Sequence, residues 1–224
     1  TIAYTSFFRL KNVYDEIRKS KRKFIIKEDH VSLKDIFYSI FYCFRLFKIK
    51  ITSKKKYNID FSILIENDLK KLTGSNIAIE GFINYFFFKN ISIKNFDIKL
   101  VINWWENQSI DRGLCYGVKN FFPNTSLVGY LGYVPRKNEI QLFPTKNEYK
   151  SNVIPNIISV IGKSVVKSIK TLNKNQKVNI APAFRYQHLY NKNRKKLNKK
   201  ILLVALPITF NDTNQILKQI LSCD

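Results

Sequence analysis

The chain lacks methionine altogether, even at position 1, and it is poor in acidic residues. Its first residues, 1–5, look like the middle of a strand, and residues 218–224 stop directly after a predicted helix. We therefore expect the sequence to be a segment of a longer protein. Residues 1–56 also contain neither glycine nor proline, the two residues that most often interrupt regular structure. This segment can therefore be largely helical.

Cysteine is rare, and its positions have no metal-binding spacing. Cys43, Cys115 and Cys223 stand alone, and the first two lie among apolar neighbours. This pattern favours free thiols in a reducing compartment over a disulfide or a zinc site. No group of Asp, Glu or His suggests a metal centre either, so we predict no metal site.

No long hydrophobic run is present. The longest run, residues 36–47, contains Arg45, and it is much shorter than the roughly 20 apolar residues that a bilayer span needs. No signal peptide is visible, although a longer N-terminus could hide one. An apolar content of 45% over 224 residues argues against a disordered chain and gives room for one large domain or one and a half α/β domains.

Residues 34–47 predict a helix that Asp29 or Ser32 could cap. One side of it carries an apolar stripe, which consists of Ile36, Phe37, Ile40, Phe41, Phe44 and Phe47. We favour packing of this stripe on the core, and the alternative is a helix on a membrane surface with its aromatic side in the headgroups. Two further helices are predicted over residues 59–72 and 76–89, and most aromatic residues of the second are expected in the core.

Positive charge dominates the composition. The chain has 39 Lys and Arg against 16 Asp and Glu, a formal net charge of +23 at pH 7. Basic residues crowd residues 9–56, and residues 192–200 contain no acid. This balance favours a polyanionic partner, which could be nucleic acid, anionic lipid headgroups or a phosphate-bearing substrate. The codon bias of an AT-rich genome toward Lys, Asn and Ile explains the excess equally well.

Beyond residue 95, short apolar runs alternate with helical or polar stretches, which predicts an α/β fold with a mostly parallel sheet. The predicted strands are residues 98–105, 126–131, 157–161, 178–181 and 201–206. A helix over residues 110–121 joins the first two strands and completes a βαβ unit. Residues 191–200 predict a charged connector, after which the last strand and a helix from Thr209 look like the start of a second domain.

Polar residues follow the first predicted strand at the point where it ends. Glu106, Asn107 and Gln108 come directly after Trp104 and Trp105. Ligands of open α/β sheets bind outside the carboxyl ends of the strands, so these three residues are candidates for chemistry. Partial desolvation beside the tryptophans would suit Glu106 to act as a general base that deprotonates a hydroxyl. Helix capping or an ion pair is the alternative for Glu106.

Five further residues are candidates for substrate binding. Asp111 and Arg112 lie in the first turn of the predicted helix, although the helix macrodipole alone favours an acid there. Gly132 ends another strand, where a glycine lets a substrate approach the backbone closely. Arg185 and His188 follow a later strand end: the guanidinium could hold a phosphate or a sugar carboxylate, and the imidazole could donate a proton or bind phosphate. A structural role is the alternative for each of them.

The motifs occur in a recognisable order. A strand ends in W-W-E-N-Q and is followed by a D-R-G-x-x-x-G helix, F-P, a G-Y-x-G-Y strand end, F-P-T-K-x-E, P-x-I-I-x-V-I-G-K, A-P-A-F-R-Y and K-I-L-L-V-A-L-P-I. This order resembles that of bacterial surface-carbohydrate (capsule or lipopolysaccharide) biosynthesis proteins of the GT-B glycosyltransferase type. The resemblance covers roughly residues 97–222 and is one of motif order rather than of a diagnostic signature.

The resemblance implies two Rossmann-like domains that face each other across a cleft, with the acceptor mainly on the first and the nucleotide-sugar on the second. Residues 1–190 would form the acceptor-side Rossmann-like domain, with a helical N-terminal part. Residues 191–199 would be the linker, and residues 200–224 the start of a truncated donor-binding domain. The chain is therefore expected to be inactive as a transferase by itself.

The function that the resemblance implies is transfer of a sugar from a nucleotide-sugar donor to a hydroxyl of a glycan or lipid-linked glycan acceptor, without a metal or other cofactor. Glu106 would deprotonate or orient the acceptor, while Arg185 and His188 would hold the donor phosphates. The basic surface would keep the protein on anionic lipid at the inner, cytoplasmic face of the cell membrane. The alternatives are an inactive scaffold domain and a basic nucleic-acid-binding module; no nucleic-acid-binding motif is evident, so we expect no nucleic acid partner.

Overall fold

The computed structural model describes residues 7–46, 48–49, 55–56, 59–71, 75–136, 138–190, 204, 206 and 209–222. The chain divides into two compact units, Thr1–Arg185 and Tyr186–Asp224. The first unit contains a parallel sheet with surrounding helices, so the fold is α/β. Within the described ranges, no helix has the length and apolar character needed to cross a membrane.

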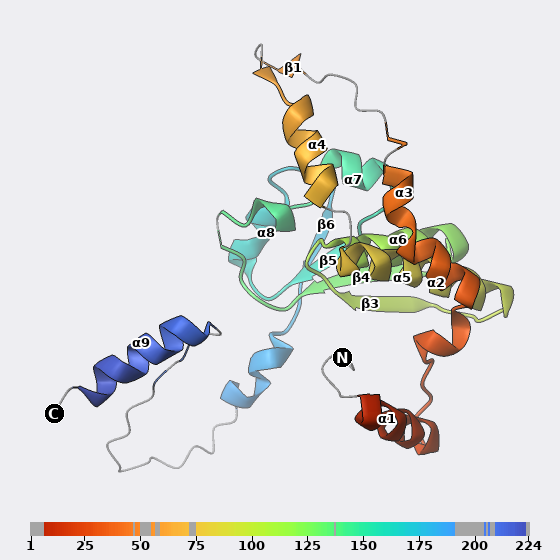
Figure 1. Ribbon diagram of the computed structural model, residues 1–224, viewed down its shortest axis with the longest axis horizontal. Helices are drawn as coiled ribbons and strands as arrows, with labels where there is room; N and C mark the ends of the chain where they lie inside the picture. The colour runs from red at the N-terminus through yellow and green to blue at the C-terminus, as the bar shows by residue number, and fades with distance from the viewer. Residues whose placement is uncertain are drawn as a thin grey trace. The chain divides into compact units, whose positions relative to one another are not determined.

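The sheet of the first unit has four parallel strands that lie side by side in chain order (Figure 1). They are β3 (Leu100–Trp104), β4 (Ser126–Leu131), β5 (Ile157–Val160) and β6 (Lys177–Ile180). Trp104 of β3 is the direct neighbour of Tyr130 on β4. The predicted parallel sheet is therefore confirmed. The strand predicted over residues 201–206 lies almost wholly outside the described residues.

Helical segments connect these strands. They are α6 (Ser109–Phe121) after β3, η3 (Ile140–Leu142) and α7 (Lys146–Lys150) after β4, and α8 (Lys163–Ile169) after β5. Because the strands follow chain order, right-handed crossovers put all these connections on one face of the sheet. The buried core includes Trp105, Cys115, Val118, Leu127, Leu131, Ile158, Val160, Val165 and Ile169.

The two faces of the sheet differ in exposure. Leu127 and Ile158, on the face that the helices cover, are fully buried. Leu100, Ile102 and Trp104, on the opposite face of β3, are 52%, 64% and 45% exposed. Parallel sheets usually carry helices on both faces. The outer side of β3 is therefore an apolar surface that the described residues leave open.

The residues before the sheet are mainly helical, as predicted. In chain order they form α1 (Phe7–Lys19), η2 (Lys27–His30), α2 (Leu33–Ile40), α3 (Tyr42–Leu46), an antiparallel pair of β1 (Lys55–Lys56) and β2 (Ile59–Asp60), α4 (Ser62–Lys71) and α5 (Asn76–Ile93). The helix predicted over residues 59–72 begins only at Ser62, whose N–H donates to Asp60 Oδ1 at 2.9 Å. In the second unit, α9 (Phe210–Leu221) follows its N-cap Thr209, and the 3-10 helix η4 (Phe184–Tyr190) begins with the last two residues of the first unit.

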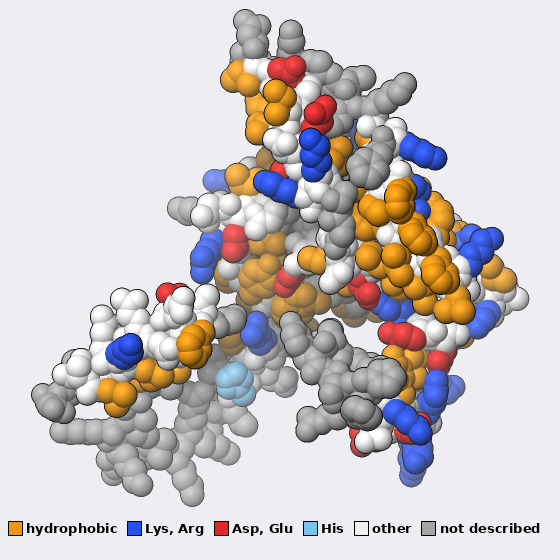
Figure 2. Space-filling model, in the orientation of Figure 1, with side chains coloured by type: hydrophobic (Ala, Val, Ile, Leu, Met, Phe, Trp, Pro, Cys, Tyr) orange, Lys and Arg blue, Asp and Glu red, His pale blue; other side chains and the backbone are white. Residues whose placement is uncertain are grey.

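The helix predicted over residues 34–47 forms as two pieces and packs through an unexpected face. α2 begins after the predicted cap Ser32 and ends at Ile40, and α3 begins at Tyr42. Tyr42 is buried, and its ring lies 5.9 Å from that of Phe82 on α5. The predicted stripe is open to solvent instead (Figure 2): Phe37, Ile40, Phe41 and Phe44 are 57%, 45%, 50% and 61% exposed. The interpretation that this stripe packs on the core is therefore wrong; Phe47 lies outside the described residues.

α5 and α6 cross through glycines. A Cβ atom at Gly113 would lie 1.9 Å from the carbonyl oxygen of Gly81, and a Cβ at Gly81 would lie 2.5 Å from that of Ser109. One turn further along α6, a Cβ at Gly117 would lie 3.1 Å from Phe88 Cβ. The two backbones therefore touch, and this contact fixes the position of the start of α6.

Candidate functional site

The end of β3 turns two adjacent tryptophans to opposite sides of the sheet. Successive side chains of a strand point to opposite faces, so Trp105 is fully buried while Trp104 is 45% exposed. The backbone N–H of Trp105 donates to Tyr130 O at 3.0 Å, which continues the pairing with β4 beyond the last residue of the strand. This hydrogen bond fixes the chain at the point where Glu106 leaves the sheet.

Glu106 is half-buried, and both of its carboxylate oxygens accept a hydrogen bond. Trp104 Nε1 donates to Oε1 at 2.8 Å, and Nε2 of the exposed Gln108 donates to Oε2 at 2.8 Å. These two donors hold the carboxylate in one orientation. Each oxygen of a carboxylate has a further lone pair, so the group can still accept a proton or a hydrogen bond from a ligand.

Asp111 is buried and organises the loop around Glu106. Its Oδ2 accepts the backbone N–H groups of Glu106 at 3.1 Å and of Gln108 at 3.0 Å, and its Oδ1 accepts from Asn103 Nδ2 at 2.8 Å. Burial raises the pKa of the Asp111 carboxyl, although these hydrogen bonds act in the opposite direction. Both carboxylate oxygens of Asp111 are therefore engaged by groups of the protein itself. In the structure Asp111 therefore positions the loop and the start of α6.

Asn107 and Arg112, both predicted to bind substrate, meet at Glu148. Asn107 is buried with a φ of 55°, and its Nδ2 donates to Gln141 O at 2.8 Å and to Glu148 Oε1 at 3.3 Å. The Arg112 guanidinium lies 2.6 Å from the same oxygen. Glu148 also accepts the Thr145 N–H at 2.7 Å and so caps α7. Glu148 is not among the predicted site residues, although T-x-x-E at 145–148 is the pattern of a capping box.

Four aromatic rings, from Trp104, Tyr130, Tyr133 and Phe184, form an aromatic cluster beside Glu106. Trp104 meets Tyr130 edge-on at 5.8 Å between ring centroids and stacks with Tyr133 at 6.4 Å, and Tyr130 meets Phe184 at 5.6 Å. The Tyr130 hydroxyl donates to the carbonyl oxygen at residue 182 at 2.9 Å and accepts the Phe184 N–H at 3.3 Å. The rings come from the ends of three strands. The carboxyl edge of the sheet was predicted as the site from the sequence, but its aromatic character was not.

Tyr133 and Gly132 lie at the end of β4, next to Trp104. Burial, and after it the charges of Glu106 and Glu139, raise the pKa of Tyr133 to about 12. The Tyr133 phenol is therefore neutral at physiological pH and can donate a hydrogen bond. Gly132 is buried, and a Cβ there would lie 2.5 Å from the Trp104 ring. The space that this glycine leaves is therefore taken by the Trp104 ring.

Arg185 and His188 lie on η4, after β6, and both are exposed. Arg185 directly follows Phe184 of the aromatic cluster and is the last residue of the first unit. His188 belongs to the second unit. Of the two, the structure therefore places only Arg185 in the same unit as Glu106.

An oriented carboxylate, exposed aromatic faces and a neutral phenol together suit a polyhydroxylated ligand. The thiol of Cys115 does not offer a nucleophile, because burial raises its pKa. Across the described ranges, no three His, Cys, Asp or Glu residues gather where they could hold a metal ion. No protein-family model matches the chain, and neither the curated proteins nor the solved structures gave a match.

Proposed function

We propose that this chain is the acceptor-side part of a GT-B glycosyltransferase, which transfers a sugar from a nucleotide-sugar to a hydroxyl of a capsule or lipopolysaccharide glycan. The supporting observation is the Glu106 carboxylate, oriented by Trp104 Nε1 and Gln108 Nε2 at 2.8 Å each, beside the aromatic cluster at the carboxyl edge of a parallel sheet. Sugar rings present apolar C–H faces that pack on aromatic rings, and hydroxyls that donate to carboxylates.

In the proposed mechanism, Glu106 accepts the proton of an acceptor hydroxyl while the hydroxyl oxygen forms a bond to the anomeric carbon of the donor sugar. The bond from that carbon to the donor phosphate breaks, and the nucleoside phosphate leaves with the electron pair. Arg185, which lies in the same unit as Glu106, would hold a donor phosphate through charge-assisted hydrogen bonds. No metal or other cofactor takes part in this scheme.

The proposal also assigns the parts of the chain. Residues 1–190 are the acceptor-side Rossmann-like domain, residues 191–199 the linker, and residues 200–224 the start of the donor-binding domain. The four parallel strands in chain order support a Rossmann-like half-sheet for the first part.

Binding of an acceptor glycan can be followed through the two tryptophans of the chain, which are adjacent at positions 104 and 105. We expect acceptor oligosaccharides to change the tryptophan emission in a saturable way. Tyr133→Ala, which removes the ring that stacks on Trp104, should weaken the apparent affinity about 3- to 10-fold, the range expected for one aromatic contact.

The matched control is Tyr149→Ala, because Tyr149 is 42% exposed and lies on α7, outside the aromatic cluster. This variant should bind the oligosaccharides as the unchanged protein does. Equal losses in the two variants, or no emission change with any glycan, would argue against a glycan acceptor at this edge of the sheet.

We further propose that the protein lies at the inner face of the cell membrane, held by anionic lipid. The net charge of +23 and the exposed stripe on α2 and α3 support this location. Figure 2 shows hydrophobic side chains gathered over these helices, with Lys and Arg side chains around them. Exposed aromatic residues next to basic residues are typical of helices that lie in the membrane interface. The basic residues 192–200 lie outside the described residues.

Liposome co-sedimentation tests this location. Binding should require anionic lipid and fade as salt rises from low to above physiological concentration, since salt screens surface charge. Phe41→Ser, in the exposed stripe, should weaken binding. Phe210→Ser should not, although Phe210 is also exposed. Tight, salt-sensitive binding to DNA or RNA without any lipid preference would favour the nucleic-acid-binding alternative.

A further inference from the structure

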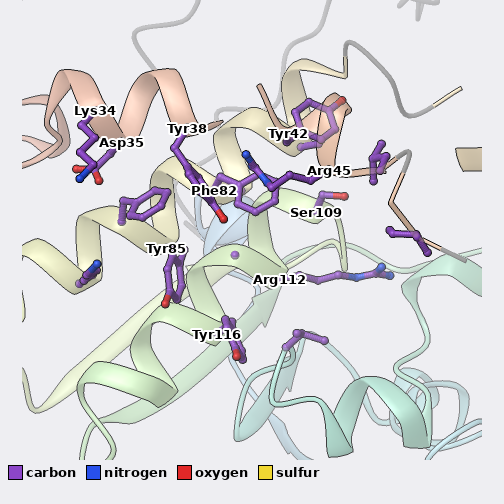
Figure 3. Close-up of a pocket in the computed structure, with 18 residues that line it drawn as sticks. Lys34, Asp35, Tyr38, Tyr42, Arg45, Phe82, Tyr85, Ser109, Arg112 and Tyr116 are labelled. Atoms are coloured by element: carbon purple, nitrogen blue, oxygen red, sulfur yellow. The ribbon is translucent and has the colours of Figure 1, made fainter. Parts of the chain in front are cut away.

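A cavity lies away from the aromatic cluster, between α2 and α3 on one side and α5 and α6 on the other (Figure 3). The cavity has a volume of about 930 Å³, which is within the range of small-molecule sites. Its wall contains six aromatic rings, those of Tyr38, Tyr42, Phe82, Tyr85, Phe86 and Tyr116. Leu46, Ile49, Ala78 and Val153 add aliphatic surface, and five charged side chains also reach the lining. A ligand of this cavity must therefore be largely apolar.

Arg45 lies among these rings without an acidic partner in the described part of the chain. Its guanidinium carbon lies 3.7 Å from the ring centroid of Tyr38 and 5.1 Å from that of Phe82. Figure 3 shows the Arg45 side chain beside the Phe82 ring, with Tyr42 on its other side. Its Nη2 atom is buried and has no hydrogen-bond partner among the described residues. A buried donor of this kind is costly unless it is paired, so Arg45 has donor capacity for an anion.

Other charges at the cavity reinforce this preference. Arg112 pairs with Glu148 through one terminal nitrogen, but its Nε is buried without a partner in the described residues. Lys34 and Lys89 also line the cavity. Asp35 is the acidic member of the described lining, and it already accepts from the Ser32 N–H at 3.0 Å and from Asn90 Nδ2 at 2.9 Å. The cavity is therefore electropositive as well as apolar.

We propose that this cavity binds an amphipathic phosphate, a lipid whose apolar chain lies between the aromatic rings and whose phosphate is held by Arg45, while Arg112, Lys34 and Lys89 add positive charge to the lining. The exposed stripe of α2 and α3, on the same two helices that supply Tyr38 and Arg45, gives such a ligand a route from a membrane surface. A nucleotide fits less well. Among the described lining residues, the hydroxyl groups are those of the tyrosines and of Ser109. The cavity therefore offers few hydrogen-bonding groups for a base and a ribose.

This assignment does not depend on the proposed transferase activity, and its test needs no sugar donor. Isothermal titration calorimetry of the whole chain with decyl phosphate, below its micelle concentration, should show saturable binding. Decanol and inorganic phosphate, each with only half of the chemistry, should bind at least about 10-fold more weakly, because a hydrogen bond to a charged group and the apolar contacts are lost in turn. Equal binding of decanol or of inorganic phosphate would overturn the proposal, and so would tighter binding of uridine monophosphate.

Two headgroup sources share this chemistry, and the ligand series separates them. Decyl phosphate is a monoester, as in a phosphorylated lipid carrier, whereas short-chain phosphatidylglycerol is a diester, as in bulk membrane lipid. Binding of either supports the site, and the tighter ligand identifies the headgroup that the cavity prefers. Absence of binding by both would overturn the proposal.

Arg45→Gln keeps much of the length of the side chain but removes its charge, and it should weaken decyl phosphate binding about 10-fold or more. Decanol binding should stay within about 2-fold of its original value, because the rings are unchanged. Lys170→Gln removes a charge at an exposed position outside the cavity and serves as the matched control. Equal effects of the two variants would mean that binding depends only on the net positive charge of the protein and not on Arg45, which would overturn the proposal.

Ala78→Phe is the second variant, which fills the cavity without removing a lining cation. It should abolish decyl phosphate binding while circular dichroism and the unfolding midpoint show a folded protein. Full binding by a folded Ala78→Phe protein would show that the ligand sits elsewhere, which also overturns the proposal.

Discussion

Glu106→Gln is expected to lower the turnover of sugar transfer by about 100-fold or more, the range for loss of a general base. Glutamine keeps the size and polarity of the side chain but cannot accept the proton of the acceptor hydroxyl. The KM for the nucleotide-sugar should stay near its original value, because other groups hold the donor. Initial rates over a range of donor and acceptor concentrations, measured on the protein as the cell makes it, separate these two effects.

The control for Glu106→Gln is the same substitution at Glu66, an exposed carboxylate on α4. Glu66→Gln should leave turnover unchanged. In Glu106→Gln, the amide nitrogen of the new side chain would face a donor, either Trp104 Nε1 or Gln108 Nε2, so the unfolding midpoint has to be measured beside the rates. A folded Glu106→Gln protein with near-normal turnover would mean that Glu106 only orders its loop, and the assignment of the catalytic base would be wrong.

The βαβ unit around Glu106 could be predicted from the sequence because its signals are local. An apolar run with two tryptophans ends at a polar corner, and the following residues change to a helical period, as β3 and α6 show. The same alternation of side chains explains why Trp105 is buried and Trp104 is half-exposed. Local patterns therefore placed Glu106 correctly at the end of a strand.

Long-range partners could not be predicted in this way. The apolar stripe of α2 and α3 has the period of a core-facing helix, but periodicity does not say which neighbour covers a face. In the structure, α5 takes the side that carries Tyr42, and Phe37 and Phe44 stay exposed. In the same way, the link from Asn107 to Glu148 joins residues 41 positions apart. Such pairs depend on how whole elements pack.

The crossing of α5 and α6 is another long-range feature, and it supports the strongest prediction on stability. Gly113→Ala should destabilise the fold by about 3 kcal/mol or more, the upper part of the range for overpacking. The added Cβ would lie 1.9 Å from the carbonyl oxygen of Gly81, so two helix backbones have to separate. Urea unfolding followed by far-ultraviolet circular dichroism measures the change.

The sign of the change in unfolding free energy distinguishes the helix contact from helix propensity. By propensity alone, replacing glycine with alanine inside a helix would stabilise it by about 1 kcal/mol. Gly162→Ala is the matched control, because a Cβ there meets only Ser164 Oγ at 3.8 Å, and loss of a glycine cap should cost less than about 1 kcal/mol. α6 also carries Asp111, which accepts the backbone N–H of Glu106 at 3.1 Å. Separation of the helices should therefore loosen the Glu106 loop and shift the tryptophan emission of folded Gly113→Ala. An equally stable or more stable Gly113→Ala protein would show that the two helices do not meet at these glycines.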